Sequence, residues 1–278
     1  MVEIMEKYLI GSDLDSTLLK NDSYTISDYT KNYIQNLDKL GSVFCIATGR
    51  PFQGAMDVYQ RLGVNTPMIA SNGGVIIYFE KDLKTIKKVV DFAMDKNEFL
   101  EFYNKIKNYL YSYQVRCPFS YHYLDYNRIP WCLIHPDPIV SMHENDIEES
   151  LINNPIDADI YIYPEYQEEF EKILKEYKNF KYIPWGKFEN HISYEISSIN
   201  ASKGKALEYI RKQYSIKKEN VFGFGDQLND YDLFTVNHGA VMLNAPEHIK
   251  ALGKNVTSFD NENDGVVRFI DSVIKLSN

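Results

Sequence analysis

The chain has 278 residues, of which 44% are hydrophobic and 25% are charged, and its formal net charge is -9. This composition is typical of a globular protein and excludes a disordered chain. The negative charge argues against a nucleic-acid partner, which would require a basic face, and a bound phosphate would need a local cation.

The start of the chain and its cysteines bear on where the protein resides. Residues 1–7 include acids and lack the apolar core of a signal peptide, and no stretch is long enough to span a membrane. The three cysteines, Cys45, Cys117 and Cys132, suggest no disulfide framework. We therefore expect a cytoplasmic protein that has no membrane partner.

Two acids follow the first apolar run of the chain. Residues 8–11 read as a buried strand, and Asp13 and Asp15 come directly after it. Side chains two residues apart on an extended segment point to the same side, so the two carboxylates would repel each other unless a cation lies between them. The carboxyl ends of strands are where open α/β sheets bind ligands.

The next segments alternate between helix and strand patterns. Residues 27–40 carry a helical stripe that begins with Ser27 as N-cap, and residues 51–62 carry a second stripe that starts at Pro51. Short apolar runs at 43–47 and 68–70 read as strands. The pattern predicts a βαβαβ unit, and hence an α/β fold with a doubly wound parallel sheet.

The character of the chain changes after residue 80. Residues 81–189 are rich in tyrosine and charge, with helical spacing at 95–108 and 167–177 and strand-like alternation at 159–163. We expect an inserted α+β domain there. The core would then be discontinuous, comprising residues 1–80 and 190–278.

The strand and helix alternation resumes near Ala201, with apolar runs at 221–225 and 239–243. Polar residues that could form one site stand at strand ends and helix starts on both sides of the insertion: Asp13 to Thr17, Ala47 to Arg50, Ser202 to Lys205, and Gly223 to Asp230. Each segment alone is a weak signal. A parallel sheet would bring them together.

These segments resemble the haloacid dehalogenase superfamily, specifically its Cof-type phosphatases with a class IIB cap. The resemblance rests on five ordered motifs: Asp13 to Leu18, Thr48 to Arg50, Ser71 to Gly74, Glu195-Ile196 followed by Ser202 to Gly204, and Gly225 to Asp230. The chain departs from the family pattern at Ser16 and at Leu243, where the family usually has glycine.

The resemblance implies a Mg²⁺-dependent phosphatase that acts on a small phosphorylated metabolite, which could be a sugar phosphate. Asp13 would be the nucleophile that forms an aspartyl-phosphate, and Asp15 would be the general acid and base. Mg²⁺ would be bound by Asp13, Asp226 and the backbone carbonyl of Asp15, with Asp230 in support.

The resemblance also implies how the phosphoryl group is held. Hydrogen bonds would come from the Leu14 backbone amide, Thr48, Gly49 and Asn229, with Lys203 as the cation and Asn72 in support. Four ionised carboxylates would exceed the charge of Mg²⁺ and Lys203, so one of them, Asp15, should be protonated when substrate is bound.

Other interpretations of these residues remain open. Asp13 and Asp15 could form a turn after a strand, Thr48 could cap the following helix, and Lys203 could be a solvated helix residue. A phosphotransferase or phosphomutase would use the same Asp13 intermediate, and a non-catalytic phospholigand sensor would keep the fold. Oligomeric state and natural substrate are not predicted.

Aromatic and polar residues of the insertion could line a pocket that selects the substrate, although such side chains more often form a core. The candidates are Tyr121, His122, Tyr123, Arg128, Trp131 and Trp185.

Overall fold

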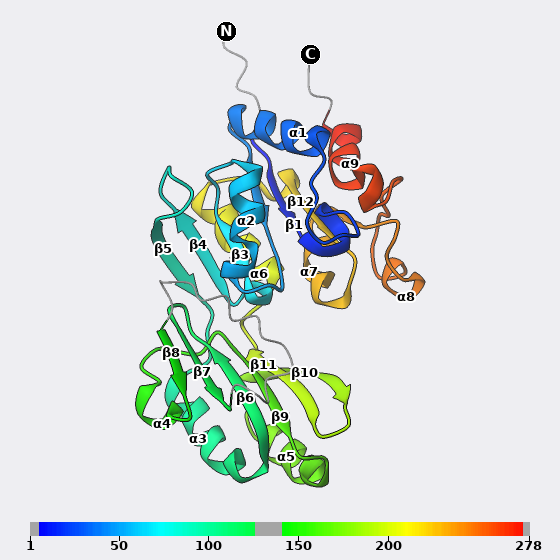
Figure 1. Cartoon of the computed structure of the whole chain (residues 1–278). Helices are drawn as coiled ribbons and strands as arrows, with labels where there is room; N and C mark the ends of the chain where they lie inside the picture. Colours follow the sequence, from blue (N-terminus) through cyan, green and yellow to red (C-terminus); the bar gives the residue numbers. More distant parts are fainter. Residues whose placement is uncertain (1–5, 126–140, 275–278) are drawn as a thin grey trace. The chain divides into compact units, whose positions relative to one another are not determined.

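The computed structural model describes residues 6–125 and 141–274 (Figure 1). The chain forms two compact units. The first contains Met1–Val90 together with Ser202–Asn278, and the second is the intervening segment Asp91–Ala201. One unit is thus inserted into the other, as expected for a discontinuous core.

Both observed boundaries differ from the expected cap at 81–189. Strands β4 (Val75–Phe79) and β5 (Ile86–Asp91) lie beside β3 (Met68–Ala70) in one sheet, which keeps this charged hairpin in the first unit. Strand β11 (Ile192–Ser198) instead pairs within the sheet of the second unit. Strand pairing, which local composition does not reveal, decides both boundaries.

A parallel sheet forms the centre of the first unit, with the strand order β13-β12-β1-β2. Its strands are β1 (Leu9–Ser12), β2 (Val43–Ile46), β12 (Val221–Gly225) and β13 (His238–Val241). All four are almost wholly buried, which explains their apolar sequences. A parallel bridge from Ala47 to Ile69 leads on to β3. The predicted α/β fold with a parallel sheet is confirmed.

Helices connect these strands in the alternation that the sequence predicts. They are α1 (Asp28–Lys39), α2 (Phe52–Leu62), α6 (Lys203–Gln213), α7 (Tyr231–Phe234), α8 (Glu247–Lys250) and α9 (Gly265–Val273). Helix α1 starts where Ser27 accepts a hydrogen bond from the Thr30 amide, as predicted. The stripe expected over residues 27–40 ends before Leu40, which follows the last helical residue and is 41% exposed.

The second unit has its own sheet and core. Its strand order is β10-β11-β9-β6-β7-β8, formed by β6 (Leu110–Arg116), β7 (Ser120–Leu124), β8 (Ser141–Glu144), β9 (Asp157–Ile162), β10 (Phe180–Lys187) and β11. Helices α3 (Lys96–Ile106), α4 (Ile147–Ser150) and α5 (Gln167–Leu174) accompany it. Phe102 and Phe170 of α3 and α5 pack on Tyr194 of β11 and its neighbours in one buried cluster. This unit is the expected α+β insertion.

Every helix within residues 6–125 and 141–274 is too short or too polar to cross a membrane.

Candidate active site

Asp13 and Asp226 meet because their strands are neighbours. Strands β1 and β12 run parallel with Ser12 beside Phe224, and the Asp13 amide donates to the Phe224 carbonyl over 3.0 Å. The chain leaves both strands at the same edge, so the two acids follow at that edge. One oxygen from each of Asp13, Asp226 and Asp230 lies within 4.8 Å of the others, and all three residues are buried.

Lys203 lies inside this acidic cluster. Its Nζ atom is 2.7 Å from Asp13 Oδ1 and 2.5 Å from Asp230 Oδ1, and its side chain is fully buried. Burial alone would lower the pKa of Lys203, but Asp13 and Asp230 raise it above its usual range, so the ammonium stays charged. The alternative of a solvated Lys203 is wrong.

The cluster carries an excess of negative charge, because three carboxylates face one ammonium. Burial, followed by repulsion from Asp230 and Asp226, raises the pKa of Asp13 to about 7 in spite of Lys203. Burial and repulsion from Asp230 likewise raise the pKa of Asp226 to about 6. Such a cluster is suited to a divalent cation, which would compensate two negative charges.

Asp230 is held rigidly. Its Oδ2 atom accepts hydrogen bonds from the backbone amides of Asp226 at 3.1 Å and Gln227 at 3.2 Å. At Gly225 a Cβ atom would lie 2.1 Å from the Asp230 Cβ, so only glycine allows this close approach. One Asp230 oxygen therefore fixes the turn while the other contacts Lys203.

Asp15 does not join the cluster. Arg50 binds its carboxylate in a bidentate contact, with Nε 2.8 Å from Oδ2 and a terminal nitrogen 2.5 Å from Oδ1. The same guanidinium donates to the Ser23 and Gly54 carbonyls. Both oxygens of Asp15 are thus occupied, and the sequence did not predict this partner because the two residues lie on separate loops.

Ser16, the first departure from the family pattern, adopts a left-handed backbone with φ 56° and ψ 13°. Glycine enters this region without steric cost, whereas serine has a Cβ atom that opposes it. The Asn244 side chain donates to the Ser16 carbonyl over 2.8 Å. Leu243, the second departure, is not one of the described residues with positive φ, so glycine is not required there.

The loops after β2 and β3 are tied together. The Asn72 amide donates to the Thr48 carbonyl over 3.1 Å, and Thr48 Oγ1 accepts from the Arg50 amide over 3.1 Å. The Asn72 side chain accepts from Asn229 over 2.9 Å, and a Cβ at Gly49 would lie 3.0 Å from Asn72 Oδ1. The expected phosphate-binding residues Thr48, Gly49 and Asn229 therefore lie around Asn72.

Other predicted and unpredicted residues complete the region. Leu14, expected to donate through its backbone, is buried directly after Asp13. Sequence reasoning assigned no role to Thr17 or Gln227, yet both side chains donate to the Asp226 carboxylate, at 3.4 and 3.3 Å. Their presence inside the quoted motifs was the available signal.

The candidate selectivity residues of the second unit have separate surroundings. His122 is buried between the Ser120 and Ser150 hydroxyls, at 2.9 and 2.7 Å, which makes it a core residue. Trp185 is 60% exposed and donates to Glu195. Tyr121 and Tyr123 are two residues apart on β7 and therefore point to the same face of the sheet. Arg128 and Trp131 lie outside the described residues.

The sequence and the fold are similar to those of known proteins. A family model described as haloacid dehalogenase-like hydrolase matches residues 10–270. The chain is 28% identical to the Bacillus subtilis 5-amino-6-(5-phospho-D-ribitylamino)uracil phosphatase YitU over 97% of this chain and 98% of that protein. It is 26% identical to the B. subtilis phosphatase YwpJ over 96% of this chain and 99% of that protein.

Solved structures share the fold at lower identity. The crystal structure of TM0651 from Thermotoga maritima has a TM-score of 0.76 at 23% identity and covers 98% of both chains. A Bacteroides thetaiotaomicron phosphatase of the haloalkanoate superfamily, BT1666, has a TM-score of 0.74 at 18% identity, with 98% of this chain and 96% of that chain covered. Both comparisons therefore extend over the core and the insertion.

Proposed function

Because the chain belongs to the haloacid dehalogenase-like hydrolases and is a phosphatase, we propose that it hydrolyses a small phosphorylated metabolite through an aspartyl-phosphate at Asp13. The observation that carries this proposal is the buried contact of Asp13 with Lys203 beside Asp226 and Asp230. A turn or a helix cap would not require a buried lysine among three carboxylates.

We propose Mg²⁺ as the cofactor, and the residues present fit it. Mg²⁺ prefers hard oxygen ligands at about 2.1 Å, so two oxygens on opposite sides of the ion lie about 4.2 Å apart. One carboxylate oxygen from each of Asp13, Asp226 and Asp230 lies within 4.8 Å of the others. Small side-chain rotations would bring these oxygens to the separation of about 4.2 Å that the ion requires. Asp13 and Asp226 are the ligands we assign, with Asp230 in support. When bound, Mg²⁺ would offset the negative charge of the phosphoryl oxygens.

Asp13 attacks phosphorus in the proposed reaction. Lys203 donates to Asp13 Oδ1, which leaves the second carboxylate oxygen available for attack. A bond forms between that oxygen and phosphorus as the bond from phosphorus to the leaving oxygen breaks. Water then attacks the same phosphorus and the Asp13 carboxylate leaves, which releases inorganic phosphate.

Asp15 handles the proton in both steps. It donates to the leaving oxygen in the first step and takes a proton from the attacking water in the second. Because Arg50 occupies both oxygens of Asp15, this contact has to open before Asp15 can carry a proton to the substrate. We therefore propose that Arg50 holds Asp15 until the substrate is bound.

The substrate class is proposed from the site and from one relative. YitU is named for the phosphate ester of a ribitylamino-uracil. That ester and sugar phosphates share a primary phosphate on a polyhydroxylated carbon chain. We propose phosphates of this class as the substrates.

The direct test measures inorganic phosphate released from a panel of sugar and polyol phosphates, including the ester named for YitU, with and without Mg²⁺. Asp13→Asn should lower kcat by about 10⁴-fold, because the nucleophile is removed. Asp57→Asn is the matched control, since Asp57 is an exposed surface residue of α2 that pairs with Arg61. Full turnover by Asp13→Asn would contradict the nucleophile assignment.

The role of Asp15 is tested separately by the leaving group. Asp15→Asn should slow hydrolysis of alkyl phosphates by about 10² to 10⁴-fold, because their leaving oxygen must be protonated. It should slow p-nitrophenyl phosphate far less, since nitrophenolate leaves without a proton. An equal loss on both substrates would rule out Asp15 as the general acid.

A further inference from the structure

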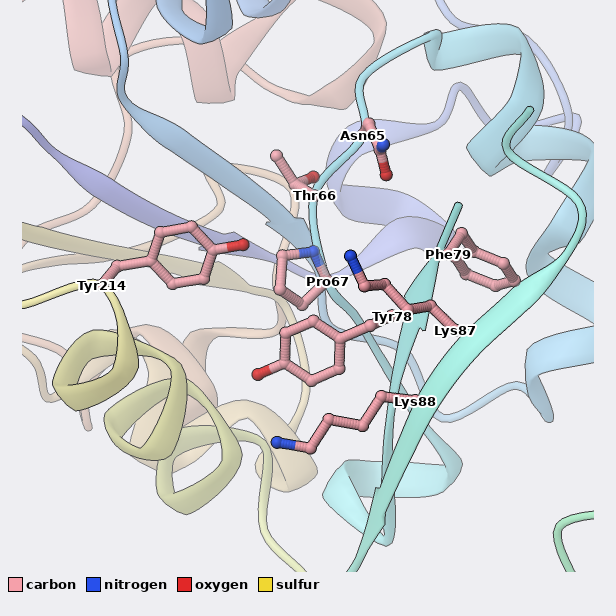
Figure 2. Close-up of a pocket in the computed structure, with 8 residues that line it drawn as sticks. All are labelled: Asn65, Thr66, Pro67, Tyr78, Phe79, Lys87, Lys88 and Tyr214. Carbon is pink, nitrogen blue, oxygen red and sulfur yellow. The ribbon is translucent and has the colours of Figure 1, made fainter. Parts of the chain in front are cut away.

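A pocket of about 220 Å³ lies in the first unit, among residues to which the proposed function assigns no role (Figure 2). Strands β4 and β5, the segment before β3 and the turn after α6 enclose it. Its lining residues are Asn65, Thr66, Pro67, Tyr78, Phe79, Lys87, Lys88 and Tyr214.

Tyr78, which lines the pocket, has a hydroxyl without a partner. The Tyr78 hydroxyl is buried and makes no hydrogen bond. Leaving such a group unsatisfied costs about 1 to 3 kcal/mol, so buried hydroxyls are nearly always paired. Because this oxygen is closed to solvent, a ligand reaches it only as the Tyr78 ring shifts, and an acceptor oxygen on the ligand would then satisfy the donor.

Two cations line the same pocket. Lys87 and Lys88 are exposed on β5, and Figure 2 shows both side chains extending from the strand toward the Tyr78 ring. The Lys88 ammonium lies 5.4 Å from the centre of that ring. Over residues 6–125 and 141–274, no carboxylate pairs with either lysine. In a protein of net charge -9, two adjacent unpaired ammonium groups favour a bound anion.

The floor of the pocket is preorganised. Thr66 Oγ1 donates to the Phe44 carbonyl, and the Thr66 carbonyl accepts from the Tyr59 hydroxyl over 2.8 Å. Both Tyr59 and Phe44 are buried in the core. Binding therefore requires little reordering of this side of the pocket, which favours affinity.

We infer that this pocket binds a small metabolite that carries a phosphate or carboxylate group. Its oxyanion accepts from the Tyr78 hydroxyl and pairs with the ammonium groups of Lys87 and Lys88. The rings of Phe79 and Tyr214 line the remaining space, which suits an apolar or aromatic body. This second site does not depend on the proposed catalytic residues.

NMR titration of the full chain labelled with ¹³C at the lysine ε-carbons tests the site. Phenylphosphonate and benzoate are the probes, because neither is hydrolysed and they separate phosphate-like from carboxylate binding. The signals of Lys87 and Lys88 should shift with saturation, while that of Lys81, an exposed lysine of the same hairpin, should not. Tighter binding of either probe identifies the oxyanion.

Variants provide the second arm of the test. Lys87→Gln and Lys88→Gln should each raise the dissociation constant of the bound probe about tenfold, and Tyr78→Phe should raise it about threefold or more. Without ligand, Tyr78→Phe should be as stable as the wild type, since its hydroxyl has no partner to lose. Lys81→Gln is the matched control, and phosphatase activity should be unchanged in all four variants. The inference is wrong if Lys87 and Lys88 respond no more than Lys81, or if Tyr78→Phe binds both probes as tightly as the wild type.

Discussion

At the scale of single residues, Lys203 has the largest predicted effect on stability. Removing one partner of a buried ion pair typically costs about 3 to 5 kcal/mol, because the remaining charge stays buried. Lys203→Met should therefore lower the free energy of unfolding by about that amount, measured by urea denaturation without divalent cations. Lys205→Met, a substitution of the exposed lysine in the same helix, should have little effect.

The pH dependence of this variant has a definite sign. The pKa of Asp13 is about 7 in the folded protein, above its usual value of 3.8. A group with a raised folded pKa contributes stability that is present below its unfolded pKa and is lost as the pH rises through the folded pKa. Lys203 limits this loss, so the deficit of Lys203→Met should be larger at about pH 8 than at about pH 5. An equal deficit at both pH values would contradict the charge imbalance.

Cation binding should depend on pH through the same carboxylates. The pKa of Asp13 is raised to about 7 and that of Asp226 to about 6, so protons compete with a divalent cation below neutral pH. The affinity for Mg²⁺ should rise as the pH increases from about 5 to 7, approaching tenfold per pH unit for each proton displaced, and level off above that range. Calorimetric titration measures it, and Asp226→Asn should reduce the slope. A flat affinity would show that these carboxylates do not bind the cation.

Ser16 carries backbone strain that glycine would relieve. A non-glycine residue in the left-handed region costs about 1 to 2 kcal/mol, and part of this is offset because glycine gains more freedom on unfolding. Ser16→Gly should therefore be more stable than Ser16→Ala by about 1 kcal/mol in urea denaturation. Ser16→Ala is the control because it removes the hydroxyl and keeps the Cβ atom. Equal stability of the two variants would mean that φ of 56° imposes no strain.

At the scale of elements, a close approach between two segments positions Lys203. Gly73 has φ of 84°, and a Cβ there would lie 2.2 Å from the Ser202 backbone at the start of α6. Gly73→Ala should lower the free energy of unfolding by about 2 to 4 kcal/mol and impair phosphate release, because the start of α6 must shift. Gly54 in α2 is the matched control, because a Cβ added there would meet nothing closer than 3.8 Å. Gly54→Ala should therefore raise the free energy of unfolding by about 0.5 to 1 kcal/mol.

The elements also show what the sequence could predict. Strand β3 and helix α1 were found from local patterns because burial on both faces and a capped amphipathic stripe leave a signal within ten or so residues. Strand β5 was assigned to the insertion because residues 81–189 are rich in tyrosine and charge, and its membership in the first unit follows only from the sheet that β4 and β5 form with β3. The contact of Arg50 with Asp15 was missed for the same reason, since it joins two loops that the fold brings together.

At the scale of the whole molecule, the two units each have a separate hydrophobic core, and the proposed cation site lies wholly in the first. A ligand stabilises only the state that binds it, by about 2.7 kcal/mol at a concentration of one hundred times its dissociation constant. The second unit contributes no carboxylate to the cluster in the described residues. Cation binding should therefore stabilise the first unit against unfolding more than the second.

Hydrogen exchange measured with and without saturating Mg²⁺ tests this at the level of peptides. Amides of β1 and β12, next to Asp13 and Asp226, should exchange about 10 to 100-fold more slowly with Mg²⁺, because their opening requires release of the cation. Amides of β6 and β9 in the second unit should change little, and Asp13→Asn should remove the difference in the first unit. If Mg²⁺ slowed amide exchange equally in both units, the two units would unfold as one cooperative unit, which would contradict this prediction.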